Sequence, residues 1–211
     1  MAFVDYLPLL DIVFTMSPLL GKAIAAIDAA NSTDPNSVQW DGPSMPKELV
    51  YGRKMSDWLT KMEPNPSEVL QLAARSQHIC RWEIPRSTYP TGRIGYLQWR
   101  TALYSHHAQR AGQILREAGY DPDTIQRVGW LLQKQNLKTN PEMQILEDVV
   151  CLVFLENELP EFMSRHPEEK LIHILKKTWK KMSPRGHAAA MDLLPRLPQA
   201  EQNLIRKALE C

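Results

Sequence analysis

The sequence has little cysteine and almost no excess of charge. Among its 211 residues, only Cys80, Cys151 and Cys211 are cysteines, and no CxxC pair is present. The sequence therefore predicts neither a zinc ribbon nor a disulfide framework, and it favours a reducing, cytoplasmic location. The 25 basic and 24 acidic side chains leave a net charge of +1. A protein that binds duplex DNA would carry a strong basic excess, so this class is not expected.

Several familiar catalytic motifs are also absent. The sequence contains no GxGxxG, GxxxxGK[ST], HExxH or GxSxG pattern. These patterns mark Rossmann dehydrogenases, P-loop enzymes, zincin metalloproteases and hydrolases with a nucleophile elbow. The sequence supports none of these four classes.

The first 20 residues are apolar, yet they do not match a membrane or signal segment. Asp5 and Asp11 interrupt the apolar run, and the basic start of a signal peptide is missing. A bilayer span needs about 20 consecutive apolar residues. We therefore expect no membrane association and assign residues 1–20 to an N-terminal extension. A docking helix, a loose extension and a targeting segment remain open for this stretch.

Strand signals are scarce in the rest of the chain, whereas helix signals are abundant. Residues 66–82 begin with Ser67 as a plausible N-cap, and residues 95–119 form one long helical pattern that ends at a glycine. Residues 32–46 are dense in Pro, Asp, Ser and Gly, which predicts a loop. We expect a single all-α domain of about nine helices over residues 21–211.

Another helix is predicted to begin at Asn140 and Pro141, which are typical N-cap and first-turn residues. Its interior, VVCLVFL, is apolar nearly all round, as in a helix at the centre of a fold. This helix also carries the adjacent pair Glu147 and Asp148. Neighbouring residues on a helix lie about 100° apart, so at least one carboxylate should face the core.

A buried carboxylate is costly without a partner, which could be a metal, an arginine or a lysine. Glu147 and Asp148 are therefore candidates for a ligand-binding role, in which a metal is one of the partners to consider. A buried salt bridge that fixes the helix register is an equally open alternative.

Histidines gather at two places. His78 lies in LAARSQHICRW, close to Arg75, and the pair His106 and His107 lies on the next predicted helix. One residue of that pair can face inward while the other faces water. A lone histidine on a helix more often has a structural role than binds a metal or another ligand. His78, however, has a polar neighbour in Arg75.

Arginines alternate with aromatic residues between positions 51 and 100. The planar guanidinium binds phosphate or carboxylate with two hydrogen bonds and stacks on rings. We predict a small anionic ligand, or single-stranded RNA, at a site formed by Arg53, Arg75, Arg81 and Lys138. In the alternative, the arginines pack over rings and pair with acids.

Several long phrases carry a resemblance to a known family. IDAANSTDPN, ELVYGRKMSDWL, LAARSQHICRW, IPRSTYPTGRIGYLQWR, LKTNPEMQILEDVVCLVFLE and KTWKKMSPRGH resemble domain of unknown function 4202. The resemblance covers roughly residues 22–192. Members are sometimes labelled glutamyl-tRNA synthetase, but this chain lacks the HIGH and KMSKS-type signatures of that enzyme.

The order of elements is also distantly similar to the HD-domain superfamily of metal-dependent phosphohydrolases. The similarity implies an HD-like fold in which His78, His107 and Asp148 hold iron, manganese or zinc. Glu147 would act as general base or support the metal ligands. The chain departs from the pattern in two places, because the first histidine is missing near Tyr51 and Ile79 replaces the aspartate of the His-Asp pair.

The resemblance thus implies a hydrolase that acts on a phosphorylated or nucleotide-like small molecule. A non-catalytic module that binds an anionic ligand, RNA or protein through the Arg and aromatic cluster is the alternative.

Overall fold

The computed structural model describes residues 17–40, 42–135 and 139–209, and most of them are helical. Within these ranges there are ten α-helices, which confirms the predicted all-α class. They are α1 Pro18–Asn31, α2 Lys47–Met62, α3 Glu68–Arg75, α4 Gly92–Ala118, α5 Pro122–Leu132, α6 Pro141–Val153, α7 Leu159–Arg165, α8 Glu168–Lys181, α9 Pro184–Leu193 and α10 Gln199–Leu209. The shorter elements are β1 Ser37–Gln39, β2 Ser44–Pro46, the 3-10 helices η1 Arg81–Glu83, η2 Arg86–Thr88 and η4 Leu194–Arg196, and the π-helix η3 Phe154–Glu158.

Side-chain caps start the helices at the predicted places. Ser67 accepts a hydrogen bond from the backbone N–H of Leu70, and Asn140 accepts one from Glu142. Such caps satisfy N–H groups that have no partner inside the helix. The long helix α4 ends as predicted at Gly119, whose φ of +111° is accessible to glycine without strain.

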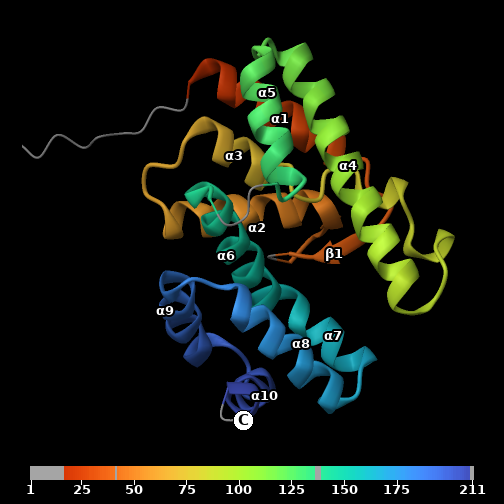
Figure 1. Ribbon diagram of the computed structural model, residues 1–211, viewed down its shortest axis with the longest axis vertical. Coiled ribbons are helices and arrows are strands. Elements are labelled where there is room, and N and C mark those ends of the chain that lie inside the picture. The colour runs from red at the N-terminus through yellow and green to blue at the C-terminus, as the bar shows by residue number, and fades with distance from the viewer. Residues whose placement is uncertain (1–16, 41, 136–138, 210–211) are drawn as a thin grey trace, which may run out of the picture.

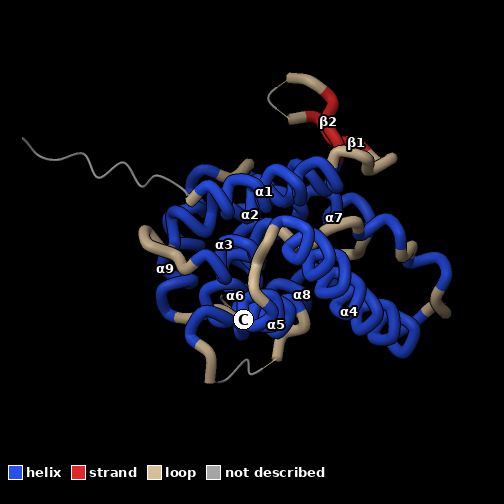
Figure 2. Tube along the Cα trace, turned by 90° about the horizontal axis from the view of Figure 1, so that it is seen from above, coloured by secondary structure: helices blue, strands red, loops and turns tan. Residues whose placement is uncertain are grey.

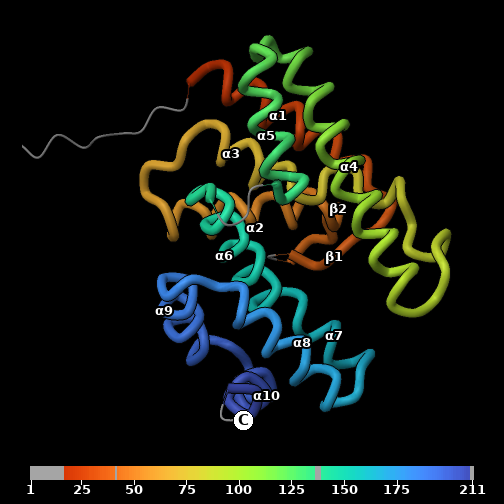
Figure 3. The backbone as a smooth tube through the Cα atoms, viewed as in Figure 1, coloured from red at the N-terminus to blue at the C-terminus, as the bar shows by residue number. Residues whose placement is uncertain are grey.

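Helix α6 lies at the centre of the fold, as its apolar sequence predicts. Its residues Leu146, Val149 and Leu152 are fully buried. In Figure 1, α6 runs between a group formed by α1, α4 and α5 and a second group formed by α7 to α10. The path of the chain in Figure 3 shows the same division. Helices α2, α3, α8 and α9 also pack against α6.

The region predicted as a loop contains a small β-hairpin, so that prediction is wrong in part. Strands β1 and β2 pair antiparallel with Val38 opposite Met45. Figure 2 shows the hairpin projecting from the helices. Three residues per strand are too few to alternate clearly between buried and exposed positions, which explains why these strands have no recognisable sequence pattern.

The helix predicted over residues 66–82 ends early, at Arg75. Cys80 has a φ of 49° in the left-handed region, which an α-helix cannot contain. Its N–H donates to the Oδ1 atom of Asn31 at 3.0 Å, and this hydrogen bond replaces a helical one. His78 and Arg81 are consequently carried on a turn and a short 3-10 helix instead of on one helical face.

The predicted N-terminal extension falls largely on residues 1–16, which lie outside the described residues. Pro18 to Leu20 belong to α1, and the predicted boundary at residue 20 stays a prediction. No helix within the described ranges is long and apolar enough to cross a membrane.

Candidate functional site

Polar side chains from four segments lie around Arg81. They come from α2, the turn after α3, α4 and η3. Together with Arg81 from η1, we call them the His78 cluster. Its members are Glu48, Tyr51, His78, Arg81, His107 and Glu158. Arg81 is near enough for its charge to act on the protonation of each of the other five. Residues more than 100 positions apart in the sequence therefore share one electrostatic environment.

Glu48 and His78 form a pair at the centre of this cluster. The Oε2 atom of Glu48 lies 3.2 Å from Nδ1 of His78, and the two side chains are 8% and 16% exposed. The ring of Tyr51 stacks on His78, with 3.7 Å between centroids and 11° between planes. These two contacts fix the imidazole, and its Nε2 edge faces away from Glu48.

Burial changes the protonation of this pair. It raises the pKa of Glu48 to about 7, although Arg81 opposes the change. Burial, followed by the charge of Arg81, holds the pKa of His78 well below its usual value. Burial also raises the pKa of Glu158 in the π-helix. A carboxyl group that titrates near neutral pH beside a neutral imidazole is suited to proton transfer.

His107 contributes two buried polar atoms that lack partners. Its side chain is 1% exposed, and neither ring nitrogen has a hydrogen-bond partner in the part of the chain that the structure describes. Its ring centroid lies 5.9 Å from that of His78. An unsatisfied buried polar group costs about 1–3 kcal/mol. A water or a ligand beside His78 would remove this cost.

Arg81 is held without an acidic partner. Its guanidinium lies 4.7 Å from the centroid of the Trp99 ring, and the indole N–H of Trp99 donates to the carbonyl of Ile84 at 2.9 Å. Among the described residues, no carboxylate lies within ion-pair distance of Arg81. The cation is therefore oriented by a ring and remains available to an anion.

The end of α1 holds the segments that carry Glu48 and His78. Asn31, which is buried, accepts the N–H of Cys80 and donates to the carbonyl of Glu48 at 3.4 Å. Asp34 accepts the N–H of Glu48 at 3.0 Å. The phrase NSTDPN thus sets the distance between the two members of the pair.

Two of the predicted anion-binding arginines lie elsewhere, in an ion-pair network around Asp28. Arg75 donates to both carboxylate oxygens of Asp28, at 2.7 and 2.6 Å, and Arg53 lies 3.7 Å from the same group. This arrangement corresponds to the alternative in which the arginines pair with acids. Lys138, the fourth predicted anion-binding residue, lies outside the described residues.

The predicted acids Glu147 and Asp148 point to different partners. Glu147 pairs with Lys134 and Lys181. Burial alone would raise the pKa of Glu147, but the two lysines hold it below the usual value. Asp148 accepts the N–H of Ser183 at 2.8 Å and its hydroxyl at 2.5 Å. Both carboxylates therefore make structural contacts between α6 and neighbouring segments.

The predicted metal ligands are not grouped together among the described residues. The described residues contain no group of three or more His, Cys, Asp or Glu side chains that could hold a metal ion. His78 and His107 do lie together, but the oxygens of Asp148 are taken by Ser183 and Gln144. The predicted set of His78, His107 and Asp148 is thus not assembled, and the residues present do not fit the metal that the HD resemblance implies.

Sequence reasoning missed Glu48, Tyr51 and Glu158. Glu48 and Tyr51 stand three positions apart, so they share one face of α2, but ELVYGRK gives no sign of what that face meets. Glu158 is placed by a π-helix, an element that frequently occurs at functional sites. A π-helix has no recognised sequence signal, so no available pattern could have found this residue.

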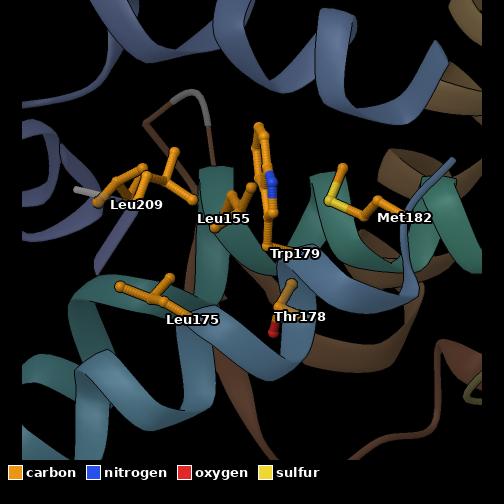
Figure 4. Close-up of a pocket in the computed structure, with 7 residues that line it drawn as sticks. Leu155, Leu175, Thr178, Trp179, Met182 and Leu209 are labelled. Carbon is orange, nitrogen blue, oxygen red and sulfur yellow. The ribbon is translucent and has the colours of Figure 1, made fainter. Parts of the chain in front are cut away.

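Two cavities lie outside the His78 cluster. Figure 4 shows the first, an apolar space of about 10 Å³ between Leu155, Trp179 and Leu209, which has room for no more than a water molecule. The second is an open cavity of about 640 Å³ whose wall includes Glu147 and Lys181. Of these two cavities, the second has the size and polarity to admit a charged small molecule.

The described residues form an all-α fold in which the buried Glu48–His78 pair lies beside Arg81, an arginine that forms no ion pair among them. A family model, Domain of unknown function (DUF4202), matches residues 21–205. The chain belongs to this family, which confirms the resemblance of its long phrases. Neither the curated proteins nor the solved structures contain a match to it.

Proposed function

We propose that this protein binds a phosphorylated small molecule at the His78 cluster and hydrolyses its phosphate ester. The observation that carries the proposal is the position of Arg81, a cation without a carboxylate partner in the described residues, beside the Glu48–His78 pair. Arginine binds phosphate oxygens with two parallel hydrogen bonds. A phosphoryl group on Arg81 would also bring a polar partner to the buried nitrogens of His107.

The Glu48–His78 pair supplies the proton transfers. Neutral His78 takes a proton from water at Nε2 while the water oxygen bonds to phosphorus. Ionised Glu48 stabilises the imidazolium through Nδ1, as in other carboxylate–histidine pairs. The ester P–O bond then breaks, and His78 returns the proton to the leaving oxygen. Because Glu48 must be ionised, activity should rise as the pH increases through about 7, the pKa of Glu48 in the fold.

A hydrolysis assay with p-nitrophenyl phosphate and nucleoside monophosphates tests the proposal. The protein is assayed after chelation and with added manganese, iron or zinc, which also tests the cofactor prediction. We expect His78→Gln and Glu48→Gln each to reduce turnover by about 10²-fold or more. His187→Gln is the matched control, because His187 stacks on Trp179 far along the sequence from the cluster. Equal turnover in all three variants would contradict the proposal.

A specific observation also favours the non-catalytic alternative. On the first two turns of α4, Ile94 is 75% exposed and Leu97 is 50% exposed, next to Arg100 and the ring of Tyr96. An apolar patch beside arginine-stacked rings is typical of a binding surface for RNA or protein. Binding of labelled single-stranded RNA without phosphate release would support this function and contradict the hydrolase. The cytoplasmic location stays a prediction under both functions.

A further inference from the structure

A second arginine, Arg100 on α4, resembles Arg81 in its surroundings. It is half-buried, and no carboxylate among the described residues pairs with it. Its guanidinium lies 5.3 Å from the ring centroid of Tyr104 and 5.8 Å from that of Tyr96, and it donates to the Tyr104 hydroxyl. Two arginines next to one cluster are thus oriented by aromatic rings instead of by acids.

Lys134 adds a third cation to the same place. Its φ of 56° lies in the left-handed region, which is uncommon for lysine and is seen most often where structure constrains the chain. Its ammonium group lies 5.8 Å from the ring centroid of Tyr104 and contacts Glu147. Arg81, Arg100 and Lys134 all lie near enough to His78 to disfavour its protonation.

Two of the cations near His78 form no ion pair among the described residues. Lys47 and Lys134 also act on His78, and they pair with Glu161 and Glu147. Arg81 and Arg100 have no such pair, although the charge of Arg81 acts on the carboxyl groups of Glu48 and Glu158. Partly buried cations repel each other more strongly than they would in water, because the local dielectric constant is lower. A bound anion with two negative charges would give both arginines an ion-pair partner.

We propose that Arg81 and Arg100 together select a phosphate monoester dianion over a phosphodiester monoanion. Each guanidinium presents a planar fork to one edge of a terminal phosphoryl group, and a diester lacks the second charge. This inference rests on the proposed function, since it assumes that the anion binds beside His78. It adds the class of substrate to that function.

Isothermal titration calorimetry with phenyl phosphate and methyl phenyl phosphate compares a dianion with a monoanion. It is carried out on the His78→Gln variant, so that hydrolysis of the ester does not contribute to the heat. At about pH 7.5 the first is doubly charged, because the second pKa of a phosphate monoester is roughly 6. The two ligands share the ring and differ in one charge. We expect phenyl phosphate to bind about tenfold more tightly or better. Equal affinities would overturn the selection of dianions while leaving the anion site intact. Binding of neither ligand would overturn the proposed function itself.

Substitutions test whether the two arginines cause the preference for phenyl phosphate over methyl phenyl phosphate. In Arg81→Met and Arg100→Met, we expect the affinity for phenyl phosphate to fall about tenfold and the ratio between the two ligands to approach one. Arg93→Met is the matched control, because Arg93 is an exposed arginine on the same helix. Arg100→Lys keeps the charge and should retain most of the ratio. Unchanged ratios in folded Arg81→Met and Arg100→Met would contradict the assignment.

Discussion

The chain contains two groups of arginines that look alike in sequence and differ in the fold. Around Asp28, the guanidinium of Arg75 donates hydrogen bonds to both carboxylate oxygens, and that of Arg53 lies beside them. Around His78, Arg81 and Arg100 rest on aromatic rings with no acid within ion-pair distance among the described residues. The first group has its counter-charge inside the protein. The second group has the geometry of a site that takes its counter-charge from a ligand.

The largest expected effect on stability is at Asp148, whose partners, like those of Asp28, lie inside the protein. Asp148→Ala removes the partner of the Ser183 N–H and hydroxyl in a buried position. Leaving such groups unpaired should lower the free energy of unfolding by about 3 kcal/mol. Urea unfolding gives this value, and calorimetry of the remaining folded protein should show unchanged affinity for phenyl phosphate. A loss of affinity for phenyl phosphate in the folded variant would show that Asp148 takes part in ligand binding.

Glu48→Gln tests the His78 cluster, because the raised pKa of Glu48 makes the stability of the protein depend on pH. The folded pKa of Glu48, about 7, lies above its ordinary value near 4.5, so the native state binds the proton more tightly than the unfolded chain. Glu48 therefore favours folding below about pH 4.5 and loses that contribution as the pH rises through 7. This difference corresponds to roughly 3 kcal/mol at most.

Because glutamine mimics the protonated acid, Glu48→Gln should stabilise the protein more at about pH 8 than at about pH 5. Unfolding in urea at both pH values measures the change. Glu63→Gln is the control, since Glu63 forms an exposed ion pair with Arg185. An effect of Glu48→Gln that is the same at both pH values would show that Glu48 is not held as a neutral acid.

A smaller effect is expected at the satisfied network. Asp28→Asn leaves Arg75 with one neutral acceptor instead of two charged oxygens. The free energy of unfolding should fall by about 2 kcal/mol, because the Arg75 side chain is only 11% exposed. Affinity for phenyl phosphate should not change. If Asp28→Asn kept its stability but bound phenyl phosphate more weakly, the arginines around Asp28 would belong to the ligand site and the assignment of the two groups would be wrong.

Sequence reasoning identified part of this division and missed the rest for physical reasons. Helix starts at Ser67 and Asn140 were predictable because capping is local chemistry. His78 and His107 were predictable as candidates because imidazoles are rare and chemically versatile. The partners of Arg75 and Arg81 were not, since both arginines occur in one phrase and only tertiary packing decides which of them meets Asp28.

The smallest expected effect on stability is at His107. His107→Leu replaces two unsatisfied buried nitrogens with an apolar side chain of similar volume. Stability should stay within about 1 kcal/mol of the native protein or increase, because no hydrogen bond among the described residues is lost. Phosphate affinity should fall at the same time. A strongly destabilised His107→Leu would mean that the imidazole has a structural partner.

The most direct measurement is a titration of the isotope-labelled protein with inorganic phosphate, followed through the histidine side-chain signals by NMR. We expect the imidazole signals of His78 and His107 to shift together with one dissociation constant. His187, which stacks on Trp179 and contacts its carbonyl, should not shift. Signals of His78 and His107 that stay unchanged at saturating phosphate would contradict the claim that the unpaired arginines mark an anion site.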